Sequence, residues 1–230
     1  DELTSDLLSD DSSFQAAVVL ANRGVRVPWE FIDKNLLSEG ASSVKKQAAL
    51  RLLAGPAQPD KKAIQERLKT MFKDENLKEW AIWAWFAQEL PATSEIWAVL
   101  LEGGDYYNEA WADTAARILA RTPGSVDARS IQQLLTSGKR AHVLAGLLFL
   151  ENDPGLTIDR LRPFLRTGDA SITLRALEVS GARALPLTAE DLTAAMTHHF
   201  VREAEWALKV VELKALSLRS RLNIPWTEPL

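Results

Sequence analysis

The chain has 230 residues, of which 47% are hydrophobic and 25% are charged, and it carries a formal net charge of −4. This composition is typical of a folded globular protein and excludes a disordered chain, and the mild acidity lacks the overall basic footprint of a nucleic-acid-binding protein. The absence of cysteine excludes disulfides, thiolate metal sites and a cysteine nucleophile.

From the N-terminus, the hydrophobic pattern predicts a first helix around Leu3 and Leu7 and a second, alanine-rich helix around Ala17. The alanine-rich helix is marked by an alanine with an apolar residue three positions later, as Ala17 has Leu20, which is typical of a helix face packed closely on a neighbour. This mark returns every 31 to 33 residues, at the anchor alanines Ala17, Ala49, Ala81, Ala112, Ala145, Ala176 and Ala207.

A second mark, an apolar pair spaced i, i+4, lies between successive alanine-rich segments. These pairs are Ile32 with Leu36, Ile64 with Leu68, Ile96 with Leu100, Ile131 with Leu135, Leu161 with Leu165, and Leu192 with Met196. Their first members follow one another by 30 to 35 residues, so the two marks share a period. Two interleaved marks with one period indicate a repeating pair of helices, and no stretch alternates as a strand would. The sequence therefore predicts an all-α fold of about seven helix pairs.

Glycines and a threonine mark several of the predicted helix ends. Glycine just past a helix end often adopts the left-handed backbone conformation. We therefore expect that conformation at the glycines that follow first helices, Gly40, Gly103, Gly104, Gly138 and Gly168. In "LTAEDL", Thr188 with Asp191 three residues later predicts a capping box at the start of a helix.

The helix pairs resemble those of the HEAT family, including the shorter HEAT-like repeats found in phycobilin lyases. The resemblance is best seen in "IQERLKTMFKDENLKEWAIWAWFA", "IQQLLTSGKRAHVLAGLLFL" and "LRPFLRTGDASITLRALEVSGA". The last of these has a proline in its first helix (Pro163), an aspartate in its turn (Asp169) and an arginine in its second helix (Arg175), whereas other pairs lack the last two. The resemblance implies an α-α superhelix, or solenoid, in which each pair stacks on its neighbours. A tetratricopeptide array is the alternative, but its period of about 34 residues and its Gly-Tyr signature fit less well.

The two ends of the sequence give expectations for the domain bounds and for whether the chain is part of a larger protein. We expect one domain, the HEAT-like repeat array, over residues 1–216, and a C-terminal tail or cap over residues 217–230, where the pattern stops. Because the chain begins at Asp1, we expect a processed chain or a part of a larger protein or complex, with any signal or anchor upstream. The compartment stays open, the cytoplasm being favoured over an extracytoplasmic location. We expect no membrane span, since the longest apolar run covers only Val143 to Leu150.

The segment "EWAIWAWFAQEL", Glu79 to Leu90, contains three tryptophans, and comparison of the helix pairs separates them. We call residues at the same distance from the anchor alanine in different helix pairs a column. Trp85 lies four positions after its anchor, in a column that also holds Leu53 and Phe149. We therefore expect Trp85 to lie in the core, together with Phe86. Two positions after the anchor, by contrast, most residues are polar or charged, and Trp83 is the exception.

We expect the partner-binding residues to be Trp83, Trp97, Tyr106 and Tyr107. Trp97 is also a large apolar residue in a column that is polar in the other first helices. Exposed tryptophan is strongly enriched at binding hot spots, which favours a contact role for both tryptophans. Tyr106 and Tyr107 follow the double glycine in a predicted loop.

No catalytic residues, metal site or cofactor site is predicted. His198 and His199 are adjacent, so their rings diverge on a helix and do not readily chelate one metal ion. Motifs for nucleotide binding, serine hydrolysis and zinc peptidase chemistry are missing from the sequence.

The sequence favours a non-enzymatic interaction or scaffold module that binds a protein or peptide on the concave surface of the repeats, and nucleic acid is not expected. The HEAT resemblance implies two alternatives. One is a HEAT-like DNA glycosylase acting on alkylated bases, and the other is a bilin-lyase-like enzyme. For the glycosylase, the residues that could form the site are Trp80, Trp83, Trp111, Asp113 and Arg117.

Overall fold

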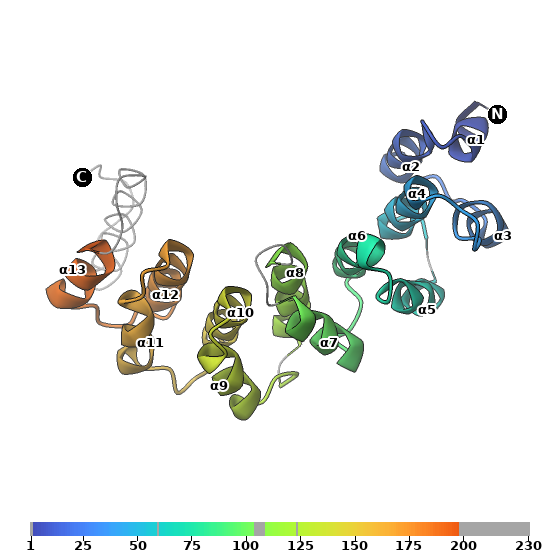
Figure 1. Ribbon diagram of the computed structural model, residues 1–230. Helices are drawn as coiled ribbons and strands as arrows, with labels where there is room; N and C mark the ends of the chain where they lie inside the picture. Colours follow the sequence, from blue (N-terminus) through green and yellow to red (C-terminus); the bar gives the residue numbers. More distant parts are fainter. Residues whose placement is uncertain (1, 59, 104–108, 123, 198–230) are drawn as a thin grey trace, which may run out of the picture. The chain divides into compact units, whose positions relative to one another are not determined.

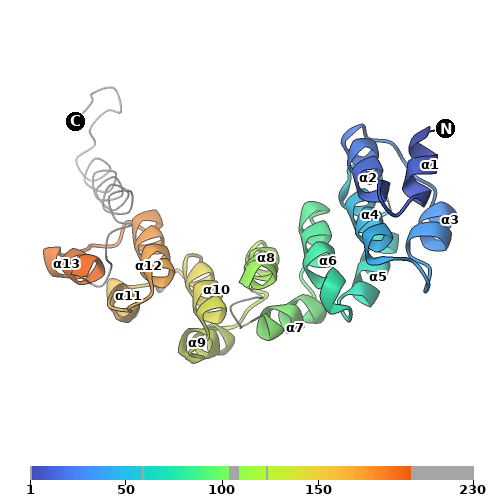
Figure 2. The same cartoon turned by 45° about the horizontal axis from the view of Figure 1, so that its top comes forward.

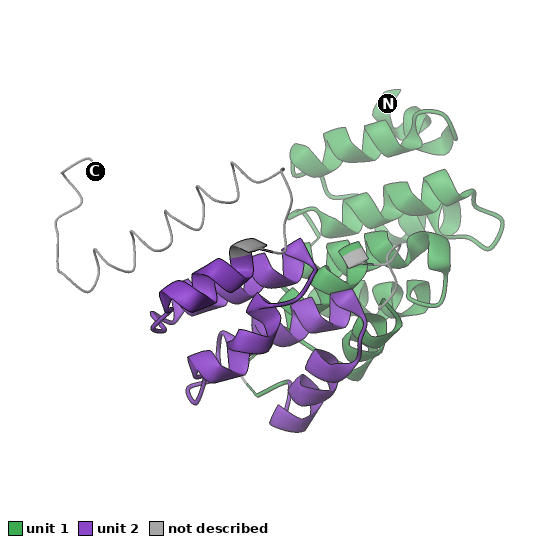
Figure 3. Ribbon diagram, turned by 60° about the vertical axis from the view of Figure 1, so that its left-hand side comes forward, with its two compact units in different colours: residues 1–125 green, residues 126–230 purple. Residues whose placement is uncertain are grey.

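The computed structural model describes residues 2–58, 60–103, 109–122 and 124–197. All regular secondary structure in these ranges is helical, which confirms the all-α class. The helices divide between two compact units, unit 1 with residues 1–125 and unit 2 with residues 126–230 (Figure 3). The single array over residues 1–216 stays a prediction, and the predicted tail at 217–230 lies outside the described residues.

Unit 1 carries the first nine described helices, one of which is a short π-helix, η1 (Figure 1). They are α1 (Glu2–Leu8), α2 (Ser13–Asn22), α3 (Trp29–Phe31), η1 (Ile32–Leu36), α4 (Ser43–Ala54), α5 (Lys61–Met71), α6 (Glu75–Ala87), α7 (Ser94–Glu102) and α8 (Glu109–Ala120).

Unit 2 carries the remaining described helices. They are α9 (Ala128–Thr136), α10 (Arg140–Leu150), α11 (Ile158–Leu165), α12 (Ala170–Ala182) and α13 (Ala189–Thr197). Pro163 lies inside α11, as the sequence predicts. Throughout the described ranges, each helix is too short or too polar to cross a bilayer.

Polar side chains start many of the helices by accepting hydrogen bonds from backbone N–H groups that have no partner within the helix. The N-cap residues that do so are Ser42 for α4, Asp60 for α5, Asp74 for α6, Asp127 for α9 and Asp169 for α12. The aspartates also place negative charge at the positive end of the helix dipole.

The capping box predicted before α13 is confirmed and is part of a larger network. The Thr188 N–H and hydroxyl donate to the Asp191 carboxylate (3.0 and 2.9 Å), and the Asp191 N–H donates to the Thr188 hydroxyl (3.1 Å). The Arg162 Nε of α11 also donates to Asp191 (2.9 Å), whose side chain is only 2% exposed. Burial alone would raise the pKa of Asp191, but the hydrogen bonds from Arg162 and Thr188 outweigh it and lower that pKa.

Within each unit the helices form two layers (Figures 1 and 2). In unit 1, α2, α4, α6 and α8 pack each against the next, and η1, α5 and α7 pack against α4, α6 and α8 from the other layer. In unit 2, α10 packs against α12, while α9 and α11 pack against α10 and α12. We call α2, α4, α6, α8, α10 and α12 the second helices. They carry the anchor alanines.

The anchor alanines lie where the sequence predicts. The six that fall in the described residues are 0–3% exposed. Small side chains at these positions allow the second helices to approach closely. The apolar pairs of the first helices are also buried, with half-buried Leu3, Ile131 and Leu135 as exceptions among the described members.

Side-chain hydrogen bonds join the end of a second helix to the end of the second helix before it. Each bond runs from a side-chain N–H to a backbone carbonyl 32 to 35 residues earlier in the sequence. The bonded residues are therefore separated by about one repeat period. The bonds run from Gln88 to Leu53 and Gly55 (both 2.7 Å), from Arg121 to Phe86 (3.1 Å) and from Arg183 to Glu151 (3.2 Å).

The expected left-handed glycines are found in part. Gly138 has φ of 73°, but Gly40, Gly103 and Gly168 do not have positive φ, and Gly104 lies outside the described residues. At Gly103 the requirement is space, because an added Cβ would lie 2.5 Å from the indole nitrogen of Trp111. That prediction is therefore wrong for three of the four described glycines.

Left-handed residues instead end second helices. Gly24, Glu89 and Ala184 have φ of 65°, 52° and 50°, and each follows the end of α2, α6 or α12. The next residue then donates its N–H to the carbonyl five positions earlier, as Leu90 does to Trp85 (3.2 Å). This is the Schellman arrangement, which usually takes glycine at the left-handed position.

Candidate functional site

Helix α6 presents three aromatic side chains, Trp80, Trp83 and Phe86, at spacings i, i+3 and i+6. At 100° per residue these positions fall within an arc of about 120° on one side of the helix. All three are half-buried, whereas Trp85 is 0% exposed, donates its indole N–H to the Pro91 carbonyl (3.1 Å) and packs on Phe72. The core prediction is confirmed for Trp85.

The core prediction is wrong for Phe86. It lies five positions after the anchor alanine, a column that holds Asn22 in α2 and Arg117 in α8. Both of those residues are exposed, but the same column holds Leu150 in α10, which is 0% exposed, so the surroundings of this position differ from one helix pair to the next. The column of Phe86 holds both polar and apolar residues, so it gives a weaker indication than the largely apolar column of Trp85.

Edge-on ring contacts extend the aromatic surface from α6 to α2. Phe14 of α2 meets Trp80 with ring centroids 5.3 Å apart and planes at 73°, and Trp80 meets Trp83 at 6.4 Å and 84°. Such edge-to-face geometry places the positive edge of one ring on the negative face of the next and is favourable. Trp83 is therefore held in an ordered cluster with part of its surface in solvent.

Arginines from the two neighbouring second helices lie over the ends of this cluster. The guanidinium carbon of Arg51 in α4 is 4.9 Å from the Trp83 ring centroid, and that of Arg121, the residue after α8, is 3.6 Å from the Phe86 ring centroid. Both distances are within the range of cation–π attraction. We call this surface the α6 stripe. It consists of Phe14, Arg51, Trp80, Trp83, Phe86 and Arg121.

The other predicted partner-binding residues do not join the α6 stripe. Trp97 is half-buried, but it lies on α7, in the opposite layer of unit 1. Tyr106 and Tyr107 lie outside the described residues. Of the four predicted residues, only Trp83 is placed in the aromatic surface.

The residues of the glycosylase alternative have separate surroundings. Trp80 and Trp83 belong to the α6 stripe, while Trp111 is buried with its ring 5.1 Å from the Lys78 ammonium. The Asp113 carboxylate accepts a hydrogen bond from Arg117 (2.6 Å) in an exposed pair one helical turn apart. That carboxylate is therefore engaged by a cation.

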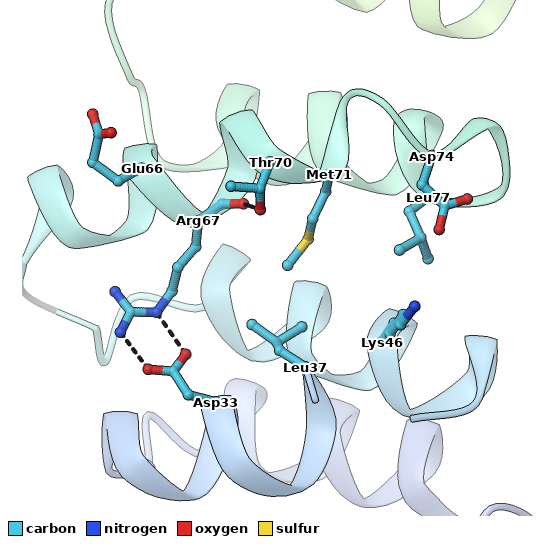
Figure 4. Close-up of a pocket in the computed structure, with 9 residues that line it drawn as sticks. All are labelled: Asp33, Leu37, Lys46, Glu66, Arg67, Thr70, Met71, Asp74 and Leu77. Carbon is cyan, nitrogen blue, oxygen red and sulfur yellow. Dashed lines mark hydrogen bonds and ion pairs between the residues drawn. The ribbon is translucent and has the colours of Figure 1, made fainter. Parts of the chain in front are cut away.

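A pocket of about 450 Å³, which sequence reasoning missed, lies between η1, α4, α5 and α6 (Figure 4). Its apolar surface comes from Leu37, Met71 and Leu77. In Figure 4, Met71 and Leu77 point from the α5–α6 side toward Leu37 and Lys46 on the other side. The residues come from four elements far apart in the sequence, and no local motif marks them.

One wall of the pocket is a doubly hydrogen-bonded ion pair. Arg67 donates to both carboxylate oxygens of Asp33 (2.9 and 2.6 Å), and its guanidinium also lies 4.2 Å from the Trp29 ring centroid. The hydrogen bond to Asp33 raises the pKa of Arg67 above its ordinary value. The rim also carries Lys46 and Thr70.

Sequence reasoning also missed a buried lysine at the start of α6. The Lys78 side chain is 4% exposed, and its ammonium donates to Glu75 and to Glu102 at the end of α7 (both 2.7 Å). Burial acts to lower the pKa of Lys78, but the two carboxylates outweigh it and raise that pKa, so the ammonium stays charged. The signal was a lysine three residues before an anchor alanine, close to the buried face of the helix.

No group of three or more potential metal-ligating side chains occurs among the residues that the structure describes. The α6 stripe offers rings and guanidinium N–H groups, which bind surfaces and side chains and supply no nucleophile. Comparison with protein families, with curated proteins and with solved structures finds no match to this chain.

Proposed function

We propose that this protein is a HEAT-like α-solenoid that acts as a non-enzymatic interaction module and binds a protein partner through the α6 stripe. The observation that carries the proposal is a set of ordered, half-buried aromatic side chains with arginines over their rings. Tryptophan, tyrosine and arginine dominate the energetics of protein interfaces because they combine a large apolar area with donors that are fixed in direction.

The geometry of the stripe supports a surface contact more than a reaction centre. Its residues come from α2, α4 and α6 and from the residue after α8, so they spread across four adjacent helices of one layer. Helical repeat proteins bind partners on extended surfaces of this kind, and their function depends on the surface residues and not on the fold alone. The HEAT-like part of the proposal rests on the period, on the paired layers and on the buried anchor alanines.

The proposal is tested by removing the stripe from the intact chain. Proteins that crosslink to the native chain would be identified and their affinities compared with those for Trp83→Ala and Phe86→Ala. We expect each substitution to weaken the same partner at least about tenfold, as hot-spot truncations do. Circular dichroism would confirm that the variants are folded.

Leu8→Ala is the matched control, because Leu8 is 48% exposed on α1 and lies outside the stripe. It should leave partner affinity within about twofold of the native value, as most surface contacts do. Trp97→Ala tests the other predicted tryptophan in the same way. Equal partner binding by the native chain and by both stripe variants would contradict the proposal.

A further inference from the structure

Two lysines occupy the same position in successive second helices. Lys46 in α4 and Lys78 in α6 each lie three residues before an anchor alanine, Ala49 or Ala81, and they are 32 residues apart. Because the helix pairs repeat with this offset, the surroundings of one lysine can be compared with those of the other, residue by residue.

The two carboxylates that pair with Lys78 have no carboxylate at the equivalent positions near Lys46. Lys78 is paired with Glu75 in its own helix and with Glu102 at the end of α7. Thirty-two residues earlier in the sequence the equivalents are Ser43 and Thr70, which carry hydroxyl groups in place of carboxylates. Thr70 lines the pocket, so the place equivalent to that of the Glu102 carboxylate lies at this pocket.

Lys46 is the cation of the pocket that forms no ion pair with a described residue. Its ammonium makes no ion pair or hydrogen bond with any residue that the structure describes. The other charges are engaged: Asp33 with Arg67 (2.6 Å), Glu66 with Lys69 (3.7 Å), and Asp74 as the N-cap of α6.

The space beside the two lysines also differs. At Lys78 the Trp111 ring lies 5.1 Å from the ammonium and packs on Gly103. Trp80, which like Trp111 stands one position before an anchor alanine, contacts Phe14 and Trp83 in the α6 stripe. Near Lys46 an open volume of about 450 Å³ remains, bounded by Leu37, Met71 and Leu77 and by polar and charged side chains (Figure 4).

We infer that this pocket binds an acidic side chain of a protein partner, whose carboxylate pairs with Lys46 as Glu102 pairs with Lys78, and that an adjacent apolar side chain of the same segment packs on Leu37, Met71 and Leu77. The inference deepens the proposed function, on which it rests for the partner being a protein. The volume is at the small end of ligand pockets and suits one or two side chains. Met71 adds an adaptable contact, because thioether side chains adjust to ligands of different shape.

The test uses the full chain, labelled for NMR, and a blocked hexapeptide with Leu-Glu at its centre. Chemical-shift changes should map to the amides of Leu37, Met71 and Leu77. Peptides with Leu-Gln or Leu-Lys at the centre are the controls for charge. We expect the Leu-Glu peptide to bind about three- to fivefold more tightly than the Leu-Gln peptide, as for a single exposed ion pair.

Substitutions at the pocket make the test specific. Thr70→Glu supplies the missing carboxylate from within the chain and should reduce Leu-Glu peptide binding about tenfold by occupying Lys46 and the space beside it. Thr70→Gln matches its size without the charge and should stay within about threefold of the native affinity. Lys46→Glu should reverse the preference, so that the Leu-Lys peptide binds best.

Lys45→Gln is the control on the same helix, because Lys45 pairs with Asp10 away from the pocket (3.0 Å), and it should leave the peptide preference unchanged. The inference is overturned if millimolar Leu-Glu peptide causes no shifts at the pocket, if it binds no better than Leu-Gln, or if Thr70→Glu leaves binding intact. Such a result would leave the α6 stripe untouched, because Trp83→Ala and Phe86→Ala test the stripe separately.

Discussion

The two units hold their helix pairs together with different side-chain chemistry. In unit 1, Arg51, Arg67 and Arg121 each lie over an aromatic ring of a neighbouring helix. In the described part of unit 2, the arginines that link helices reach carboxylates, a carbonyl and, for Arg140, also the Ser171 hydroxyl. These carboxylate pairs are Arg140 with Asp169 (3.2 Å), Arg162 with Asp191 (2.9 Å) and Arg166 with Glu190 (3.2 Å).

This difference indicates which unit has surface left for a partner. A guanidinium paired with a carboxylate of its own chain has its charge neutralised, and its N–H groups are engaged. The stacked arginines of unit 1 also use N–H groups within the chain, because Arg67 donates to Asp33, Arg121 to the Phe86 carbonyl and Arg51 to Asn22. Unit 1 contains ion pairs as unit 2 does, and what distinguishes it among the described residues is the set of half-buried aromatic rings with arginines over them. The three predictions below test this contrast.

The largest expected effect separates the core tryptophan of α6 from the tryptophan of the stripe. Trp85→Ala should lower the free energy of unfolding by about 3–5 kcal/mol, because it leaves a cavity at a fully buried site. Trp83→Ala should lower it by about 1 kcal/mol, because the side chain is half-buried. Chemical denaturation of both variants measures the difference, and equal losses would show that Trp83 belongs to the core.

An intermediate effect is expected for the ion-pair network of unit 2. Asp191→Asn should lower the free energy of unfolding at neutral pH by about 2 kcal/mol, because a buried carboxylate that accepts from Arg162 and Thr188 is lost. Glu190→Gln is the matched control on the same helix. Glu190 is largely exposed, so this change should cost under about 0.5 kcal/mol.

The pH dependence of this effect has a defined sign. The pKa of Asp191 is lowered in the folded state, so its carboxylate stabilises the fold fully above the unfolded pKa of about 4. That stabilisation is lost as the pH falls through the lowered folded-state pKa. Denaturation between pH 7 and pH 3 should therefore show native and Asp191→Asn stabilities converging at the acid end, and a constant gap would argue against the network.

The smallest effect is a gain in stability at the helix ends that both units share. Glu89 and Ala184 hold left-handed backbone conformations with φ of 52° and 50°, which cost energy in residues with a side chain. Glu89→Gly and Ala184→Gly should each raise the free energy of unfolding by about 0.5 kcal/mol, after allowing for the greater freedom of glycine in the unfolded chain. Melting curves would detect this, with Ala98→Gly at an exposed position inside α7 as a control that should destabilise.

Sequence reasoning predicts the helix pairs of this protein and their buried positions well because these features repeat with one period. The anchor alanines are buried because two helices of each layer must approach at the same point in every pair, and selection of small residues there leaves a visible repeat. Trp85 was placed correctly by the same comparison. Phe86 was misplaced because it was grouped with its sequence neighbour, although one residue rotates the side chain by about 100° around the helix.

The pocket and the arginine contacts could not be predicted in the same way. In the sequence, Arg51 is an ordinary polar residue. Only its contact with the Trp83 ring, 32 residues away, places it in the α6 stripe. Lys46 and Lys78 have the same residue type in the same column. Their difference depends on Thr70 and Glu102, which lie on the following first helices. Such contacts join two different positions in neighbouring helix pairs. Comparing one position across the pairs therefore does not predict them.

The hydrogen bonds that end the second helices give the chain a direction of assembly. Gln88 satisfies the carbonyls of Leu53 and Gly55, and Arg183 satisfies that of Glu151, so the donor always belongs to the later helix pair. During synthesis on the ribosome, the carbonyls of Leu53 and Gly55 can therefore bond only to water until α6 has emerged and docked. The docking of each new helix pair therefore completes the hydrogen bonds of the pair before it. A chain arrested before that docking would expose the last turn of its final second helix to water and to other chains.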